Sequence, residues 1–416
     1  MINYNTLSKK VKADLLNYSN KLTLGLFRTD LKFVTQMIYG RTAGSSSYLS
    51  DIARSLNESI TIKKSIDRLS RNLNNFKQMD LVYNNYIQTI KPRINKDTIF
   101  CVDHSDIVKV ASQKLEYLAD IVDGSRDNSY AKGYYMTEIT ALNKNKQPIS
   151  TYSNVWSQLE PGFISQNDIL FKALDKNIEN FGTSGTYVMD RGFDSNAVLR
   201  YLTKNKLKYI IRMKKTRKVI HQKKRKSIDN VVLNIKGKTN ITVMFNDESY
   251  ECKVSHTKVK LSGFKDDMTL VVMYGIGNIP FKLLTNKSIK SKQDLIKVVR
   301  DYLSRWRIEE YFKFKKQQFN FEKLLVRSLS SIRNLNSLIT FVIGYLGVLS
   351  NENDVYTIHM IKTGKSIKQK VQFWYYQIIR GIVEVISIIK ENINKEFVRI
   401  KKKRERNLFT INGIKI

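Results

Sequence analysis

Residues 98–213 restrict the fold more than any other part of the sequence. Five short runs there are rich in β-branched and aromatic residues, and two longer runs have the apolar spacing of helices. The predicted strands cover residues 98–103, 133–142, 149–156, 185–190 and 208–213. The predicted helices cover residues 164–181 and 195–205. Three consecutive strands followed by helical crossovers are typical of an RNase H-like sheet, so we predict an α/β fold with an RNase H-like core.

Two of these strands end on a carboxylate. Asp103 ends the first strand and Asp190 ends the fourth. In an RNase H-like sheet the ends of the first and fourth strands lie side by side, so we expect the two carboxylates to be neighbours. Asp106 and Asp194 are the alternatives at these positions. Asp106 lies beyond the predicted strand end, and Asp194 stands at the start of a helix, where capping of the helix N-terminus is the expected role.

A third carboxylate lies on a predicted helix further along the chain. Residues 302–316 contain neither Pro nor Gly, and we predict one continuous helix. At about 100° per residue, four of its side chains fall within roughly 60° of one another on one face. They are Tyr302, Arg305, Glu309 and Lys316. Glu310, the alternative carboxylate, lies about 100° around the helix from this face. An ordinary solvated face with i,i+4 ion pairs would give the same pattern.

Asp103, Asp190 and Glu309 would converge in this fold. Oxygen-only ligand sets of this kind suit Mg²⁺ or Mn²⁺. Two such ions about 4 Å apart can activate an attacking water or hydroxyl and stabilise the leaving oxygen in phosphodiester chemistry. We therefore expect these three residues to hold two Mg²⁺ or Mn²⁺ ions. The alternative is three unrelated acids at the ends of elements.

The charge balance indicates a nucleic acid as the partner. The sequence has 72 Lys and Arg against 37 Asp and Glu, a net charge of +35. This charge is spread along the chain and is not gathered on one amphipathic segment, so nucleic acid fits better than a membrane surface. Hydrophobic residues make up 42% of the chain, which excludes a disordered protein. Cys101 and Cys252 stand alone, which argues against a zinc site or a disulfide framework.

The sequence also bears on where the protein resides. Its N-terminus lacks the pattern of a signal peptide. The longest apolar run, residues 335–349, is interrupted by polar residues and Gly344, and suits a buried core helix better than a membrane span. We expect a cytoplasmic protein associated with the nucleoid.

The regions around the core differ from it in composition. We expect a helical N-terminal domain, the first part of the core, a β-rich insertion, the Glu309-bearing part of the core and a helical C-terminal region. They cover residues 1–92, 93–213, 214–290, 291–330 and 331–416. The last region ends in a basic tail at residues 401–406.

Two of these regions carry more specific patterns. Residues 49–73 resemble a helix-turn-helix whose second helix is rich in Lys and Arg, although a plain helical hairpin is the alternative. The insertion begins with basic clusters at residues 214–218 and 223–226. Its predicted strands cover residues 241–245, 250–254, 270–274 and 280–285. A large irregular loop is the alternative for this segment.

The spacing of the four residues on the Glu309 helix resembles a known signature. Tyr302, Arg305, Glu309 and Lys316 fit, position for position, the Y-x2-R-x3-E-x6-K signature of bacterial insertion-sequence DDE transposases of the IS-four type. Residues 188–194 and 102–106 resemble the family's second and first aspartate blocks. The resemblance covers about residues 98–330, including a β-rich insertion between the second Asp and the Glu.

The resemblance implies a function. Asp103, Asp190 and Glu309 would be the metal ligands, and the reaction would be metal-dependent nicking at transposon ends followed by strand transfer through the freed 3′-hydroxyl. The partners would be double-stranded DNA, both the terminal inverted repeats and the target, with a dimer in the synaptic complex and the N-terminal helices binding the ends. The residues expected to contact DNA are Tyr302, Arg305, Lys316 and Arg191.

One departure from the family concerns the hairpin intermediate. Relatives that form hairpins can stack a flipped base on an aromatic group in the insertion, typically Trp, and this insertion has no Trp. Tyr274 or Phe281 could take that place, although we expect both to pack in the core. Two other functions stay open. One is a catalytically inactive DNA-binding relic or regulator at transposon ends, and the other is a standalone RNase H-like nuclease.

Overall fold

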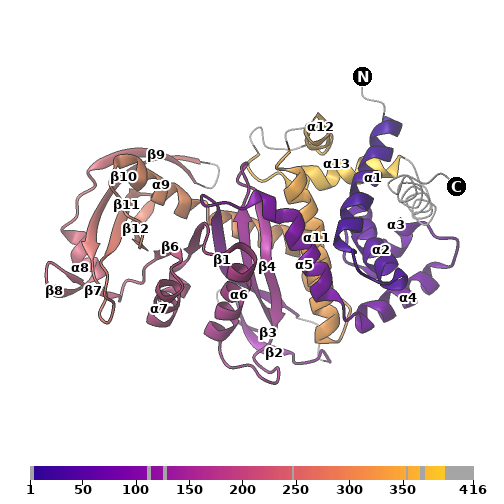
Figure 1. Cartoon of the computed structure of the whole chain (residues 1–416), viewed down its shortest axis with the longest axis horizontal. Coiled ribbons are helices and arrows are strands. Elements are labelled where there is room, and N and C mark those ends of the chain that lie inside the picture. Colours follow the sequence, from indigo (N-terminus) through magenta and orange to yellow (C-terminus); the bar gives the residue numbers. More distant parts are fainter. Residues whose placement is uncertain are drawn as a thin grey trace, which may run out of the picture.

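The computed structural model describes residues 4–109, 114–124, 129–245, 248–352, 355–365 and 371–388. The predicted basic tail at residues 401–406 lies outside this part of the chain. The molecule is elongated, with helices at one end, a mixed sheet in the middle and the insertion at the other end (Figure 1).

The middle of the molecule is built on six strands. They are β1 (Ile99–Val108), β2 (Ala119–Asp123), β3 (Ser129–Leu142), β4 (Pro148–Trp156), β5 (Thr186–Met189) and β6 (Lys208–Arg212). The spatial order is β4-β3-β1-β5-β6, with β2 along the first part of β3. Strand β1 runs antiparallel to β3 and parallel to β5, which in turn runs parallel to β6. The predicted α/β class is confirmed, and this strand order fits the expected RNase H-like core.

Helices connect and cover these strands. Helix α6 (Gln166–Phe181) joins β4 to β5, and α7 (Asn196–Lys204) joins β5 to β6. Both begin with a serine cap, because Ser165 and Ser195 accept hydrogen bonds from the backbone N–H groups three residues ahead. Their bounds lie within two residues of the predicted ones.

The insertion extends the core sheet. It contains the short hairpin β7 (Lys218–His221) and β8 (Lys224–Ser227), helix α8 (Ile228–Leu233), and strands β9 (Thr239–Phe245), β10 (Glu248–Val259), β11 (Met268–Gly275) and β12 (Gly277–Thr285). The four predicted strands correspond to β9–β12, so the irregular-loop alternative is wrong. Strand β12 pairs antiparallel with β6, which makes one sheet from β2 to β9. The division into domains stays a prediction.

The predicted continuous helix over residues 302–316 is wrong. Helix α9 (Lys292–Leu303) ends before Ser304, and α10 (Trp306–Gln318) begins after Arg305. The Ser304 hydroxyl donates to the Asp301 carbonyl at 2.6 Å, and the Arg305 N–H bonds to Tyr302, three residues back. The two helices also pack on different parts of the sheet, since α9 contacts β5, β6 and β9–β11 while α10 contacts β1 and β4.

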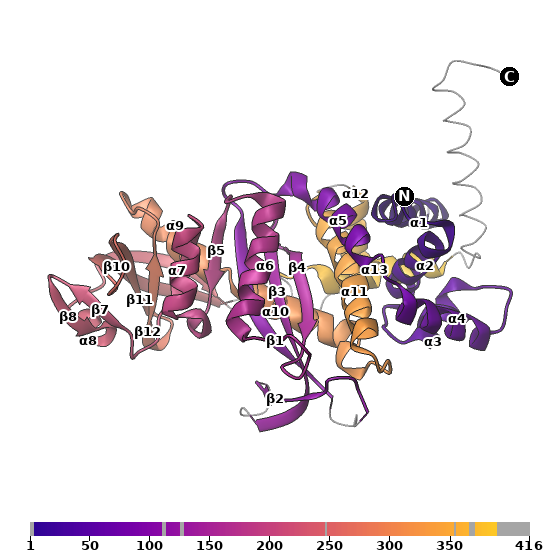
Figure 2. The same cartoon turned by 60° about the horizontal axis from the view of Figure 1, so that its bottom comes forward.

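The remaining helices form one end of the molecule. The N-terminal ones are α1 (Tyr4–Leu22), α2 (Arg28–Gly44), α3 (Leu49–Leu56), α4 (Ile62–Asn75) and α5 (Met79–Ile90). The C-terminal ones are α11 (Leu329–Leu349), α12 (Val355–Thr363) and α13 (Tyr375–Ser387). Helix α11 lies between the core sheet and the N-terminal helices (Figure 2). It is long and apolar enough to cross a membrane, but 78% of its apolar window is buried inside the protein, as expected of a core helix.

Candidate active site

The parallel pairing of β1 and β5 places two carboxylates next to each other. Its last register pair joins Val102 to Met189, so Asp103 and Asp190 are the next residues on neighbouring strands. The prediction that the strand ends at Asp103 is wrong, because β1 continues to Val108 along β3 after β5 has stopped. Asp190 leaves its strand and accepts a hydrogen bond from the Gly192 N–H at 2.7 Å. The expected neighbourhood of the two aspartates is therefore present.

Arg305 connects Glu309 to Asp103. Its Nη1 lies 3.0 Å from Asp103 Oδ2, and its Nη2 lies 2.5 Å from Glu309 Oε1. The three side chains are 14% (Arg305), 19% (Asp103) and 34% (Glu309) exposed, so the group is shielded but open to solvent. The break before α10 puts Arg305 one turn ahead of Glu309, at the start of the helix that packs on β1.

The electrostatics of Asp103 reflect this crowded position. The pKa of Asp103 is raised to about 7: burial is the largest cause, the charges of Asp190 and Glu309 act in the same direction, and Arg305 opposes them. The charges of Asp190 and Glu309 both act on the Asp103 carboxyl, so both acids lie close enough to influence it. A carboxyl with such a pKa is favoured in its charged form by any further cation nearby.

The side chains of the three acids are not arranged as a complete set of metal ligands. In the described part of the chain, no group of three His, Cys, Asp or Glu side chains is arranged to hold a metal ion. Arg305 contacts two of the three carboxylates and supplies the positive charge between them. The oxygen donors themselves have the chemistry that Mg²⁺ or Mn²⁺ prefers.

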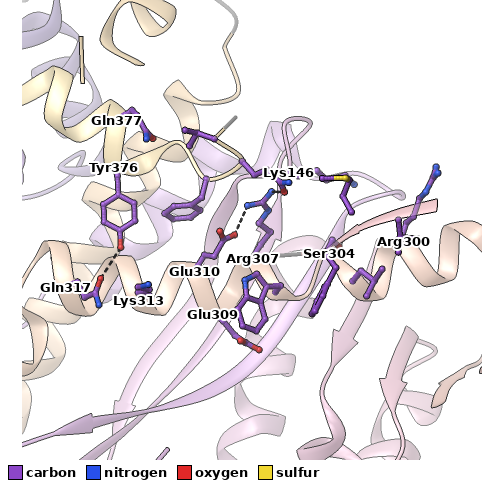
Figure 3. Close-up of a pocket in the computed structure, with 18 of the residues that line it drawn as sticks. Lys146, Arg300, Ser304, Arg307, Glu309, Glu310, Lys313, Gln317, Tyr376 and Gln377 are labelled. Carbon is purple, nitrogen blue, oxygen red and sulfur yellow. Dashed lines mark hydrogen bonds and ion pairs between the residues drawn. The ribbon is translucent and has the colours of Figure 1, made fainter. Parts of the chain in front are cut away.

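The alternative carboxylates have other partners. Glu310 pairs with Arg307 at 2.6 Å, and Figure 3 shows Glu309 and Glu310 pointing to different sides of α10. Asp106 lies within β1 and pairs with Lys316 at 3.2 Å. Asp194 is buried and accepts from Arg217 Nε at 2.9 Å. The predicted helix-capping role of Asp194 is wrong, because Ser195 caps α7 and Asp194 instead fixes the start of the insertion.

The four residues expected to contact DNA differ in exposure. Tyr302 is 3% exposed and packs edge-to-face on Phe281 of the insertion. Lys316 is 18% exposed and pairs with Asp106 and Glu322. Arg191 is exposed directly after Asp190. Because of the helix break, Tyr302 belongs to α9 and Lys316 to α10. These residues therefore do not share the single helix face that was predicted.

A cleft of about 1200 Å³ adjoins Glu309 (Figure 3). It lies between α9 and α10, strand β9 of the insertion, and the segment that begins α13. Its lining contains two acids, Glu309 and Glu310, and five cations. The cations are Lys146, Arg300, Arg307, Lys313 and Arg380. The cleft is therefore a basic groove with a carboxylate from the candidate site in its lining.

The cleft contains an aromatic residue that the sequence analysis did not single out. Trp306 is 37% exposed there and packs edge-to-face on Phe245 of β9. Tyr274 and Phe281, the predicted alternatives, have structural contacts: the Tyr274 hydroxyl donates to the Ile235 carbonyl at 2.6 Å, and Phe281 is 8% exposed. Trp306 precedes the α10 turn that carries Glu309, and only the search for a stacking group outside the insertion would have found it.

Comparisons with known proteins point to a family for part of the chain. Residues 155–344 match the family described as Transposase DDE domain, a span that includes Asp190 and Glu309 and begins after Asp103. No curated protein matches the sequence. The cryo-EM structure of piggyBac transposase synaptic complex with hairpin DNA is similar at a TM-score of 0.44 and 11% identity, over 94% of this chain and 81% of that chain. The family match, together with the paired aspartates and Glu309, supports a DDE transposase.

Proposed function

We propose that this protein nicks DNA at transposon ends in a metal-dependent reaction and transfers the freed strand to a target. The observation that carries the proposal is the placement of Asp103, Asp190 and Glu309: parallel strands set the first two side by side, and Arg305 connects Glu309 to Asp103. The fold we assign to this core is RNase H-like, and the chain around it has a net charge of +35.

In this proposal Asp103, Asp190 and Glu309 hold Mg²⁺ or Mn²⁺. Two such ions supply an activated nucleophile and a stabilised leaving oxygen. The three carboxylates would bind and orient these ions, and Asp103 must be charged to do so. With Arg305 as its neighbour the pKa of Asp103 is about 7, raised mainly by burial, and a bound divalent cation would favour the charged form further.

Arg305 is the residue we assign to the scissile phosphate. Its planar guanidinium already binds two carboxylates, and a phosphate offers the same fork-like pair of acceptors. A phosphate at this position would free Asp103 and Glu309 for metal binding. Arg191, exposed beside Asp190, and Lys316, at the far end of α10, would contact phosphates on either side.

The N-terminal helices are the proposed end-binding region. Helices α3 and α4 lie at residues predicted as a helix-turn-helix, and the Thr61 side chain caps α4. Lys63, Lys64 and Arg71 are exposed on α4, whereas Arg68 pairs with Glu58 at 2.6 Å and holds the turn. We expect the exposed three to contact DNA phosphates, with two copies of the chain meeting in the synaptic complex.

The inactive relic remains the alternative, and one observation favours it. Arg305 binds two of the three acids, as it would in a site that no longer binds metal. The test is to incubate the protein with a duplex carrying the element's own end and Mg²⁺. A nick at the end boundary that disappears in Glu309→Gln supports the enzyme. Binding without a nick in either Mg²⁺ or Mn²⁺ supports the relic.

A further inference from the structure

A basic hairpin leaves the sheet at the same edge as the candidate active site. Strand β6 runs parallel to β5, so its end at Arg212 lies on the edge where Asp190 follows β5. The next residues are tied back to this edge, because the Lys214 N–H donates to Asp194 Oδ2 at 2.8 Å and Arg217 pairs with the same carboxylate. The hairpin of β7 and β8 therefore starts beside the segment that carries Asp190.

The charge of this hairpin is all of one sign. Residues 214–227 contain eight Lys and Arg and no Asp or Glu. Among the described residues, only Arg217 of these eight has an ion pair, to Asp194. Six of the others are exposed, near the two ends of the hairpin, and they are Lys214, Lys215, Lys218, Lys223, Lys224 and Arg225. Positive charge left without acidic partners is available to an external polyanion.

The hairpin holds its shape in spite of an unfavourable turn. Val219 is buried, and the backbone of Ile220 exchanges two hydrogen bonds with Lys260, at 2.7 and 2.9 Å. At the tip, Gln222 and Lys223 have φ values of +51° and +61°. A two-residue turn with two positive φ values favours Asn-Gly. This turn has Lys223 at the second position, where a glycine would be less strained.

We propose that the β7–β8 hairpin binds the phosphate backbone of the duplex on the β6 side of the scissile bond. This inference rests on the proposed function, because it assumes DNA at Asp103, Asp190 and Glu309. In this proposal a duplex held there continues past β6, along the side where Lys214 and Arg217 bond to Asp194, and reaches the hairpin. The contacts are sequence-independent, and they fix the direction in which one leg of the DNA leaves the active site.

A membrane surface fits the hairpin less well than DNA does. The structure describes all of residues 214–227, and none of the large apolar side chains in this range is exposed. An interfacial segment needs such side chains in addition to its cations. A membrane partner would also not account for the position of the hairpin near the candidate active site.

The test compares two pairs of lysines that change the net charge equally. Lys223→Ala/Lys224→Ala removes two cations from the hairpin, and Lys172→Ala/Lys176→Ala removes two from the exposed face of α6, where they pair with Asp168 and Glu179. Binding is measured by fluorescence anisotropy over a range of salt, with duplexes shortened stepwise from either side of the end boundary. We expect the hairpin pair to lower the salt slope by about 2, since each phosphate contact contributes about 0.9.

The length dependence separates a local contact from a general effect of charge. The loss in the hairpin variant should vanish once the leg on one side is shortened, and the α6 variant should keep the wild-type slope on every duplex. Equal losses in both variants, or a loss that does not depend on duplex length, would overturn the proposal. So would an unchanged slope in the hairpin variant.

A second variant guards against loss of the hairpin itself. Gln222→Asn/Lys223→Gly supplies the favoured turn and removes one cation, so we expect an equal or higher Tm and a salt slope lower by about 1. A wild-type slope in this variant would contradict a contact at Lys223. The two failures can be told apart: a protein that binds DNA through the hairpin but does not nick would refute the proposed nicking, and the salt slopes would still test the hairpin contact.

Discussion

Helix α10 carries two acid–base clusters of different kinds. Lys315 and Glu138 are both fully buried and lie 3.1 Å apart, and the other Lys315 donors go to Ser153 and Thr340 at 3.0 and 2.9 Å. Arg305, Asp103 and Glu309 are partly exposed. Burial nevertheless raises the pKa of Asp103, the carboxyl that must be charged to bind a metal ion. The first cluster has every partner it needs inside the protein and fixes the helix. The second has partners that a phosphate or a metal ion can replace.

The largest effect expected from this difference is on cleavage. Glu309→Gln and Asp103→Asn should each reduce DNA nicking by about 10³-fold or more, because each removes a proposed metal ligand. End binding should stay within about twofold of wild type, since phosphate contacts elsewhere supply the affinity. Gel-based cleavage and binding assays with one labelled end measure both. Parallel loss of binding and cleavage would contradict the ligand assignment.

The buried cluster should instead affect stability. Lys315→Met leaves the Glu138 charge unpaired in the core, which we expect to lower the free energy of unfolding by about 3–5 kcal/mol. Lys316→Met, the next residue, should cost about 1 kcal/mol or less because its pairs with Asp106 and Glu322 are partly exposed. Urea denaturation of both variants measures the difference. Equal losses would mean that α10 is not fixed by Lys315.

The same two lysines show where the sequence is informative and where it is not. Strand order and the neighbourhood of Asp103 and Asp190 could be predicted, because parallel strands end at a common edge. The helical period also separated Glu309 from Glu310, which pairs with Arg307. The sequence alone does not show that Lys315 is buried and Lys316 is not, since burial of a charge depends on partners far away in the sequence, such as Glu138. The break at Ser304 was missed for a similar reason, because packing on two parts of the sheet causes it without Pro or Gly.

Replacing Arg305 should have an intermediate effect. Arg305→Ala should weaken the complex with cleavable DNA about tenfold and lower the salt slope by about 1, because one phosphate contact is lost. Arg333→Ala is the matched control, since Arg333 also pairs with a carboxylate, Glu160 at 2.6 Å, away from the site. Anisotropy titrations over a range of salt compare them. If both variants keep the wild-type slope, Arg305 is structural.

A smaller effect concerns pH. The folded-state pKa of Asp103 is about 7, above its usual range, so the folded protein binds more protons than the unfolded chain between about pH 4 and pH 7. Stability relative to Asp103→Asn should therefore fall as pH rises through this window, in the absence of divalent metal. Thermal denaturation of both proteins from pH 4 to pH 8 measures the trend. A difference that is constant with pH would mean that Asp103 titrates normally.

The smallest expected effect is at Glu310. Because its carboxylate pairs with Arg307 on another side of α10, Glu310→Gln should keep cleavage within about twofold of wild type. The cleavage assay used for Glu309→Gln measures it under the same conditions. An inactive Glu310→Gln with an active Glu309→Gln would exchange the roles of the two residues.

The central claim is that Asp103, Asp190 and Glu309 form one divalent-metal site, and local cleavage of the protein chain tests it most directly. Fe²⁺ in place of Mg²⁺, with ascorbate and peroxide, cuts a polypeptide next to the bound ion. With end DNA present, we predict cuts near residues 103, 190 and 309, all suppressed by excess Mg²⁺ and lost in Glu309→Gln but kept in Glu310→Gln. Cuts elsewhere, or the same cuts in Glu309→Gln, would contradict the site.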